Sequence, residues 1–157
     1  MKQERVLLLD NIRSTHNVGA IFRTADAIGI SKIYLGGITP APLDRFGRKR
    51  KDIAKSALGA EETVVWEQAN NFIETIQALK VEGYLIIALE QVEKSVDYKT
   101  LAPSEKTAVI VGNEVEGVSQ SVLDLVDKVA EIPMRGTKES LNVSVSTGIL
   151  LYRLFDR

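Results

Sequence analysis

Three short segments of the sequence combine turn residues with polar and apolar side chains in a way that could hold a flat ligand. They are 89–91 (LEQ), 112–117 (GNEVEG) and 132–136 (IPMRG). The glycines of the second and third segments allow the backbone to approach a ligand closely. The apolar side chains of Leu89, Ile132 and Met134 could enclose a base such as adenine, while backbone groups read its edge. Each segment alone also fits an ordinary strand-to-helix turn, but their recurrence favours a binding site.

The elements that must position these segments follow from hydrophobic periodicity. Apolar runs bounded by turn residues predict strands, and apolar residues spaced by three and four predict helices. The expected strands are 6–9, 32–35, 63–66, 84–89, 107–111 and 129–132; the expected helices are 17–28, 51–57, 70–81, one after Ser119 that contains Val126, and 142–155. This alternation predicts a single α/β domain over 1–157, with a mainly parallel sheet and helices on both faces. In such sheets ligands bind beyond the carboxyl ends of the strands, where the three segments fall.

Composition narrows the class of protein. The chain has 157 residues, 45% of them hydrophobic and 26% charged, which is typical of a globular domain. It has no bilayer-length apolar run and no signal peptide at its start, so we expect a cytoplasmic protein without membrane association. The sequence contains no cysteine and no cluster with metal-ligand spacing, so neither thiolate chemistry nor a metal is expected. The segment 10–17 lacks the Gly-x-Gly-x-x-Gly pattern, and no phosphate-loop motif occurs, which argues against dinucleotide-binding and P-loop folds.

Positive charge is concentrated in one part of a nearly neutral chain. The net charge is −1, yet residues 44–55 hold six cations and two anions, a local charge of +4. The segment 38–50 has two prolines and no periodicity, which is typical of a functional loop. Such a loop could contact nucleic-acid phosphates while the rest of the molecule stays near neutral. An ordinary solvated loop explains the same composition equally well.

Three ordered motifs carry a resemblance to a known family. The first is 17–23 (NVGAIFR), preceded by a strand and Asp10-Asn11. The second is 109–117 (VIVGNEVEG), and the third is 132–134 (IPM) followed by 140–146 (SLNVSVS). In identity, order and spacing they resemble the motifs of the SpoU (TrmH-like) family of RNA 2′-O-ribose methyltransferases, within the SPOUT superfamily. The resemblance extends over essentially the whole chain.

This resemblance implies a fold and an assembly that periodicity alone does not show. It implies a trefoil knot at the C-terminal end, an exception to the rule that protein chains are unknotted. It also implies S-adenosylmethionine bound in the knot by the three strand-end segments, and a homodimer with the active site at the subunit interface. The expected last helix is apolar around most of its circumference, which suits a dimer interface and equally suits burial within one subunit.

By motif position, the resemblance implies two sets of site residues. The cofactor-binding set is Leu89, Glu90, Gly112, Asn113, Gly117, Ile132, Pro133, Met134, Ser140 and Leu141. The catalytic and substrate-positioning set is Asn17, Arg23, Glu114, Ser140 and Asn142. Asn17, Ser140 and Asn142 could instead cap helices. Glu114 could instead pair with a nearby cation, and Arg23 could be an ordinary surface residue of its helix.

The implied reaction moves a methyl group from a sulfonium to a ribose 2′-hydroxyl, so the protein must align the two groups and manage a proton. Proposals for the family assign the base role to the arginine at position 23, but an arginine side chain stays protonated in nearly all proteins. We therefore favour the hypothesis that Arg23 binds the phosphate beside the target ribose and stabilises developing charge, with Glu114 orienting it. His16 is the only histidine and could accept a proton, although a solvated loop position explains it as well.

The RNA substrate is harder to predict. The chain is too short to hold an extra RNA-binding domain beside a catalytic core, so we expect the core dimer itself to grip RNA. The expected RNA-binding residues are Arg13, Arg45, Arg48, Lys49, Arg50 and Lys51. A compact stem-loop of tRNA suits a small RNA-binding surface better than a large ribosomal RNA site does, which favours tRNA over rRNA. Base methylation by a SPOUT enzyme and a non-catalytic RNA-binding factor are the alternative hypotheses.

Overall fold

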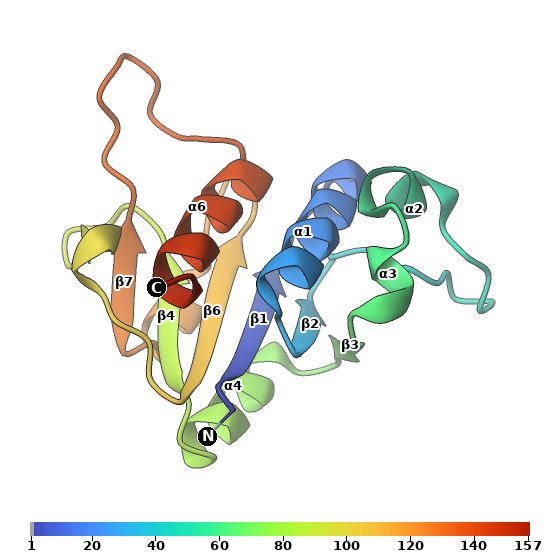
Figure 1. Ribbon diagram of the computed structural model, residues 1–157, viewed down its shortest axis with the longest axis horizontal. Helices are drawn as coiled ribbons and strands as arrows, with labels where there is room; N and C mark the ends of the chain where they lie inside the picture. Colours follow the sequence, from blue (N-terminus) through green and yellow to red (C-terminus); the bar gives the residue numbers. More distant parts are fainter. Residues whose placement is uncertain (1) are drawn as a thin grey trace.

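The computed structural model describes residues 2–157, in which a seven-stranded parallel sheet carries helices on both faces (Figure 1). The strands are β1 (Glu4–Asp10), β2 (Lys32–Gly36), β3 (Trp66–Ala69), β4 (Leu85–Leu89), β5 (Val96–Asp97), β6 (Lys106–Gly112) and β7 (Lys128–Glu131). The helices are α1 (Thr15–Ile28), α2 (Lys51–Ala57), α3 (Ala60–Thr63), α4 (Phe72–Val81), α5 (Gln120–Leu123), α6 (Val143–Phe155) and the 3-10 helix η1 (Tyr98–Thr100). The predicted α/β class with a mainly parallel sheet is confirmed.

The strand order brings the predicted ligand-binding segments to one edge of the sheet. The order is β3-β2-β1-β6-β4-β7-β5, and every pair is parallel. Asp10 at the end of β1 pairs with Gly36 of β2 and with Gly112 of β6, so these three strands end at the same level. Because parallel strands all point the same way, the segments that follow β4, β6 and β7 emerge together at the carboxyl edge.

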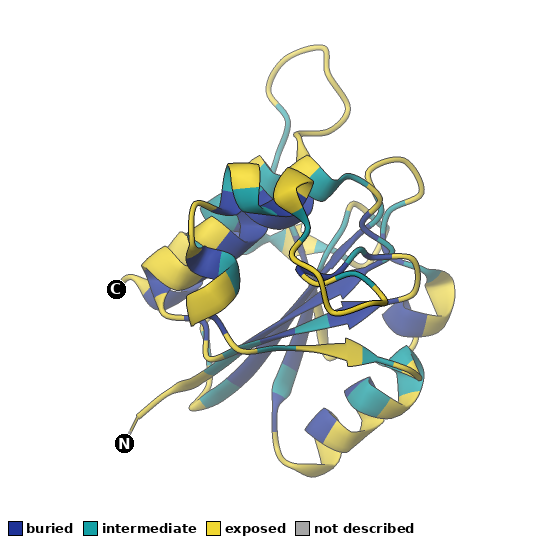
Figure 2. Cartoon of the chain, turned by 90° about the vertical axis from the view of Figure 1, so that its right-hand side faces the viewer, coloured by how far each residue is buried: buried dark blue, intermediate teal, exposed yellow. Residues whose placement is uncertain are grey.

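The central strand β1 shows why the sheet is covered on both faces. Leu7 and Leu9 pack in the core that contains α1 and α6, whereas Val6 and Leu8 pack in the core that contains α4 and α5. Successive side chains of a strand point to opposite faces. A continuous apolar run such as 6–9 is therefore what a strand between two helical layers requires. Figure 2 shows these strands buried between helices whose outer sides are exposed.

Helices α1 and α6 lie side by side on one face of the sheet (Figure 1). The side-chain oxygen of Ser14 accepts a hydrogen bond from Asn17 N and caps the start of α1, which ends at Gly29 with a φ of +80°. Asn142 caps α6 in the same way. A Cβ at Gly148 would lie 3.6 Å from Thr24 Cγ2, so α6 approaches α1 closely at this glycine. Both helices follow strands and therefore begin at the carboxyl edge.

The predicted third strand is wrong by three residues. The sequence predicts a strand at 63–66, but the structure has α3 through Thr63 and begins β3 at Trp66. The Thr63 hydroxyl donates a hydrogen bond to Asp26 Oδ1 at 3.0 Å, and Val64 is buried in the core beside α1. The β-branched run thus packs a helical turn against α1 instead of extending the sheet, because tertiary packing overrides strand propensity.

Other boundaries also depart from the sequence-based expectation. Helix α5 ends at Leu123, so Val126 lies beyond the helix in which it was expected. The short strand β5 and the 3-10 helix η1 had no signal in the periodicity. Strand β4 lies between β6 and β7 in the sheet. After β6 the chain therefore crosses to the other side of β4 before it forms β7. The knot itself and the single domain over 1–157 remain predictions.

Within residues 2–157, no helix has the length and apolar character needed to cross a bilayer.

Candidate functional site

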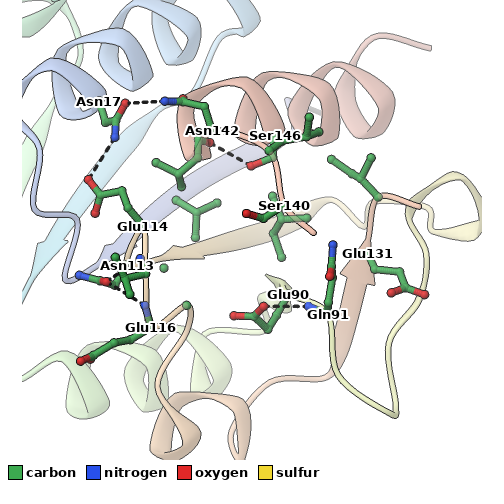
Figure 3. Close-up of a pocket in the computed structure, with 18 of the residues that line it drawn as sticks. Asn17, Glu90, Gln91, Asn113, Glu114, Glu116, Glu131, Ser140, Asn142 and Ser146 are labelled. Atoms are coloured by element: carbon green, nitrogen blue, oxygen red, sulfur yellow. Dashed lines mark hydrogen bonds between the residues drawn. The ribbon is translucent and has the colours of Figure 1, made fainter. Parts of the chain in front are cut away.

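A cavity of about 370 Å³ lies at the carboxyl edge, among the ends of β4, β6 and β7 and the start of α6 (Figure 3). Its volume is at the lower end of the range of about 300–1,000 Å³ for small-molecule sites. The predicted residues that line it are Leu89, Glu90, Gly112, Asn113, Gly117, Ile132, Met134, Ser140, Leu141, Asn17, Glu114 and Asn142. The three segments singled out in the sequence therefore meet at one cavity.

Two predicted residues do not line this cavity, and several lining residues were not predicted. Pro133 and Arg23 are absent from the lining. The unpredicted lining residues are Gln91, Val111, Val115, Glu116, Glu131, Val143 and Ser146. Ser146 belongs to the third motif, which could have signalled it. Glu131 is the last residue of β7, and no sequence signal pointed to it as part of a site.

The side chain of Asn17 joins the three motifs at this cavity. Asn17 is buried in the first turn of α1. Its Oδ1 accepts a hydrogen bond from Asn142 Nδ2 at 3.2 Å, and its Nδ2 donates one to Glu114 Oε2 at 3.1 Å (Figure 3). One amide group thus connects α1, the segment after β6 and the start of α6.

Glu114 acts as a fixed anion at the start of α1. Its Oε1 accepts a hydrogen bond from Arg13 N at 2.9 Å, and its Oε2 accepts one from Ser14 N at 2.9 Å. Burial of the carboxyl opposes ionisation, but these bonds and the one from Asn17 outweigh it and lower the pKa of Glu114 below its usual range. The expected contact in which Glu114 orients Arg23 is absent from the described residues 2–157, because the carboxylate instead ties its own segment to α1.

Asn142 caps α6 and also contacts Asn17. Its Oδ1 accepts hydrogen bonds from Ser144 N at 2.9 Å and from Val145 N at 3.4 Å, which caps α6. Its Nδ2 remains available and donates to Asn17. The capping alternative does not apply to Asn17, because Ser14 caps α1, or to Ser140, which is exposed in the cavity lining.

The segment 112–118 is a tight turn whose glycines are required by its own packing. Asn113 and Gly117 exchange backbone hydrogen bonds at 3.1 and 2.9 Å. Gly117 has a φ of +73°, and a Cβ there would meet Glu90 Oε2 at 2.0 Å. A Cβ at Gly112 would lie 2.3 Å from Val118 N, and Glu90 Oε2 accepts a hydrogen bond from that same amide at 2.9 Å. The side chain of Glu90 therefore shapes the cavity wall from outside the turn.

The charged side chains that line the cavity are all acidic. They are Glu90, Glu114, Glu116 and Glu131, and among residues 2–157 no lysine or arginine joins them. Leu89, Ile132 and Leu141 add apolar surface. Such walls suit a ligand that combines a cationic group with a flat apolar part, and they disfavour a phosphate.

A wider, open depression of about 970 Å³ adjoins the cavity. Asn17, Asn113 and Glu114 line both hollows, so the hydrogen-bonded pair of Asn17 and Glu114 stands in the wall between them. Arg13 and His16 line the depression and not the cavity. Of the residues predicted to bind RNA, only Arg13 lies beside the site.

The basic segment lies apart from both hollows and is partly neutralised. Three of its cations form ion pairs: Arg48 with Asp44 at 3.0 Å, Lys49 with Glu62 at 2.5 Å and Arg50 with Asp52 at 3.0 Å. Arg45 and Lys51 form no ion pair with any of residues 2–157. The free positive charge is therefore smaller than the local count of +4 suggests.

Arg23 lies on the exposed side of α1, nearly two helical turns beyond Asn17. It makes no side-chain hydrogen bond or ion pair with any other described residue in 2–157. One chain alone therefore does not bring Arg23 to the cavity lined by the other predicted catalytic residues.

Sequence comparison relates nearly the whole chain to known proteins. The model of the SpoU rRNA methylase family matches residues 4–152. The tRNA (guanosine(18)-2′-O)-methyltransferase of Aquifex aeolicus is 33% identical over 151 residues, which cover 96% of this chain and 68% of that protein. A protein of Staphylococcus saprophyticus assigned to the TrmH family is 33% identical over 154 residues, which cover 98% of this chain and 59% of that protein. The chain thus spans 59–68% of the length of these two relatives.

Solved structures show the same relationship in three dimensions. The A. aeolicus TrmH/SpoU tRNA modifying enzyme superposes with a TM-score of 0.84 and 31% identity, covering 97% of this chain and 74% of that chain. The AdoMet-bound rRNA methyltransferase of Sinorhizobium meliloti superposes with a TM-score of 0.86 and 30% identity, covering 98% of this chain and 56% of that chain. Both the sequence and the fold are therefore shared over almost the full length of the chain.

Proposed function

The chain belongs to the SpoU rRNA methylase family, and from that premise we propose that it transfers a methyl group from S-adenosylmethionine to a ribose 2′-hydroxyl of RNA. The observation that carries this proposal is the side chain of Asn17, which links Glu114 and Asn142 beside the acidic cavity. This single amide brings together residues of all three motifs, as a working site requires.

We assign the cavity to S-adenosylmethionine because of the chemistry of its walls. The carboxylates suit the positive charges of the sulfonium and the amino group, and the side chains of Leu89, Ile132 and Leu141 suit the adenine. When bound, this cofactor supplies an electrophilic methyl group on sulfur. The tight 112–118 turn holds the wall in place, and Glu90 supports that turn through Val118 N.

We place the target ribose in the open depression, on the other side of the wall that Asn17 and Glu114 share. The acidic cavity has no lysine or arginine in its lining among residues 2–157, whereas the depression carries Arg13 beside Glu114 and Glu116. The RNA backbone would therefore stay in the depression while one ribose reaches the wall. Asn17 and Asn142 then hold the geometry at the point where the hydroxyl must meet the methyl group.

We propose that a homodimer supplies Arg23 to this site. An exposed apolar face of α6 is available for such a contact, because Val145, Ile149 and Tyr152 recur at helical spacing and Val145 is 52% exposed. Helix α1 lies beside α6 and presents Arg23 to solvent without a partner among residues 2–157. Across a two-fold interface, Arg23 can reach the neighbouring chain's depression, where its guanidinium would bind the phosphate next to the target ribose.

We favour tRNA as the substrate, and rRNA is the second candidate. The A. aeolicus relative is named for guanosine 18 of tRNA, while the S. meliloti structure is an rRNA methyltransferase. We expect the protein to act in the cytoplasm, where both RNAs occur. Methyl transfer from labelled S-adenosylmethionine, followed by nucleoside analysis, tests the proposal. A 2′-O-methylnucleoside supports it, a methylated base favours a base methyltransferase, and no product favours a non-catalytic RNA-binding factor.

A further inference from the structure

An exposed phenylalanine lies at the tip of a hydrogen-bonded turn outside the site described above. Residues Leu43 and Lys49 form an antiparallel bridge that closes the turn, and Asp44 N donates to Arg48 O at 2.8 Å. Gly47 has a φ of +76° and turns the chain. Phe46, between these residues, is 66% exposed.

The carboxylate of Asp44 organises this tip. Its Oδ1 accepts hydrogen bonds from Phe46 N at 2.8 Å and from Arg48 N at 2.9 Å, and its Oδ2 accepts one from Arg48 Nε at 3.0 Å. The backbone hydrogen bond from Arg48 is the strongest of the influences that lower the pKa of Asp44. The turn therefore holds Phe46 in solvent before any partner arrives, which reduces the entropic cost of binding through this side chain.

Two guanidinium groups flank the exposed ring. Arg45 Cζ lies 4.8 Å and Arg48 Cζ lies 4.9 Å from the centroid of the Phe46 ring. Aromatic rings and guanidinium planes are the groups on which unpaired nucleotide bases stack. Because Arg48 is already paired with Asp44, Arg45 is the cation of the tip that remains available for a phosphate.

The segment that bears the tip leaves the sheet at the same edge as the segments that line the cavity. Residues 38–50 follow β2, and all strands are parallel, so this segment emerges with those that follow β4, β6 and β7. It projects from the side of the molecule formed by β2 and β3, as the segment before α2 in Figure 1. Ile38, at the base of the segment, lines the open depression. An RNA that enters the depression can therefore extend along the edge toward Phe46.

We propose that Phe46 stacks on an unpaired base of the RNA substrate, at a nucleotide other than the one that is methylated, while Arg45 contacts an adjacent phosphate. This inference rests on the proposed function, because it takes RNA to be the substrate. It explains how the carboxyl edge of the sheet can bind RNA although Arg48, Lys49 and Arg50 are neutralised by ion pairs. It also restricts the substrate to RNA with a single-stranded loop, bulge or end.

Substitutions at position 46 test the proposal through RNA binding. Phe46→Leu keeps an apolar side chain but removes the ring, and we expect bulk tRNA to bind about 5- to 10-fold more weakly. Because the side chain is exposed, thermal stability and S-adenosylmethionine affinity should not change. Val81→Ala is the matched control, since Val81 is 89% exposed on α4, which packs on the other face of the sheet. Equal tRNA affinity for the parent and Phe46→Leu would overturn the proposal.

A fluorescence measurement separates stacking from a general loss of contact. Phe46→Trp should keep the parent affinity, and an RNA hairpin with an unpaired loop should quench its emission more than that of the parent, which contains only Trp66. A blunt RNA duplex should produce no such difference. Equal quenching by hairpin and duplex would contradict base stacking. Methyl transfer by the parent protein is measured in parallel. A parent that modifies no RNA rejects the proposed function, whereas an active parent with an unaffected Phe46→Leu variant rejects only the stacking role.

Discussion

Asn142 Nδ2 donates a hydrogen bond to Asn17 Oδ1 at 3.2 Å across 125 positions of the sequence. Asn142 is at the same time the cap of α6, and Asn17 is at the same time the donor to Glu114. The contact therefore fixes where α1 and α6 begin relative to each other and relative to the cavity. A change in either amide is expected to affect both the packing of these helices and the geometry of the site.

We predict that Asn17→Ala lowers the free energy of unfolding by about 1–3 kcal/mol, because Glu114 and Asn142 both lose a buried hydrogen-bond partner. Methyl transfer should fall at least about 10-fold, a loss of about 1.4 kcal/mol in transition-state stabilisation. Urea denaturation and initial rates measure the two effects. Asn71→Ala is the control, since it removes the α4 cap at a cost of about 1 kcal/mol and Asn71 lines neither hollow. An equal loss of activity in both variants would mean that activity follows stability alone.

Glu114→Gln should change how stability depends on pH. The folded-state pKa of Glu114 lies below its usual value of 4.5, so its ionised form stabilises the fold above that pH. This contribution is lost as the pH falls through the folded-state pKa. Thermal melts should therefore show the parent more stable than the variant at neutral pH, with the difference shrinking as the pH falls below 4.5. A constant difference across this range would show that the Glu114 charge does not stabilise the fold.

Arg23→Ala should abolish methyl transfer without changing stability by more than about 0.5 kcal/mol, because Arg23 is exposed and makes no contact within residues 2–157 that the fold needs. The affinity for S-adenosylmethionine should also stay the same. Arg23→Lys distinguishes a phosphate clamp from a base. A clamp predicts reduced activity with an unchanged pH–rate profile. Full activity with a lower apparent pKa would instead support a base at this position.

Val145→Asp should dissociate the proposed dimer, since it places a charge on the exposed apolar face of α6. Sedimentation measures the oligomeric state, and methyl transfer should fall with dimer content because Arg23 acts across the interface. Val81→Asp, on the exposed end of α4, is the control and should change neither. A Val145→Asp variant that remains a dimer would exclude this face of α6 as the interface.

The cavity walls could be predicted because their signals are local. Apolar runs that end in segments such as 112–117 and 132–136 mark strand ends, and parallel strands bring those ends to one edge. The hydrogen bond from Asn142 to Asn17 could not be predicted, since it depends on how closely α1 and α6 pack side by side on one face of the sheet. The family motifs indicated that both residues matter, but not that they touch.

The features that the sequence did not indicate have the same origin. The run 63–66 has strand propensity, yet Thr63 at the end of α3 and Val64 just after it pack against α1. The basic segment carries a high local charge, yet Glu62, outside that segment, pairs with Lys49. Within one chain the carboxylate of Glu114 accepts three hydrogen bonds at the start of α1, and its contact with the Arg23 of a second chain stays a prediction. In each case the conformation or the charge pairing of a residue depends on a partner that is distant in sequence or lies on another element.

Methyl transfer into unmodified bulk tRNA and rRNA, with labelled S-adenosylmethionine and digestion to nucleosides for mass spectrometry, tests the proposed function most directly. The parent protein is compared with Arg23→Ala and with Asn17→Ala. We expect a 2′-O-methylnucleoside, from tRNA more than from rRNA, that disappears with Arg23→Ala and is strongly reduced with Asn17→Ala. A methylated base, or a product that persists unchanged in both variants, would contradict the ribose methyltransferase mechanism built on these residues.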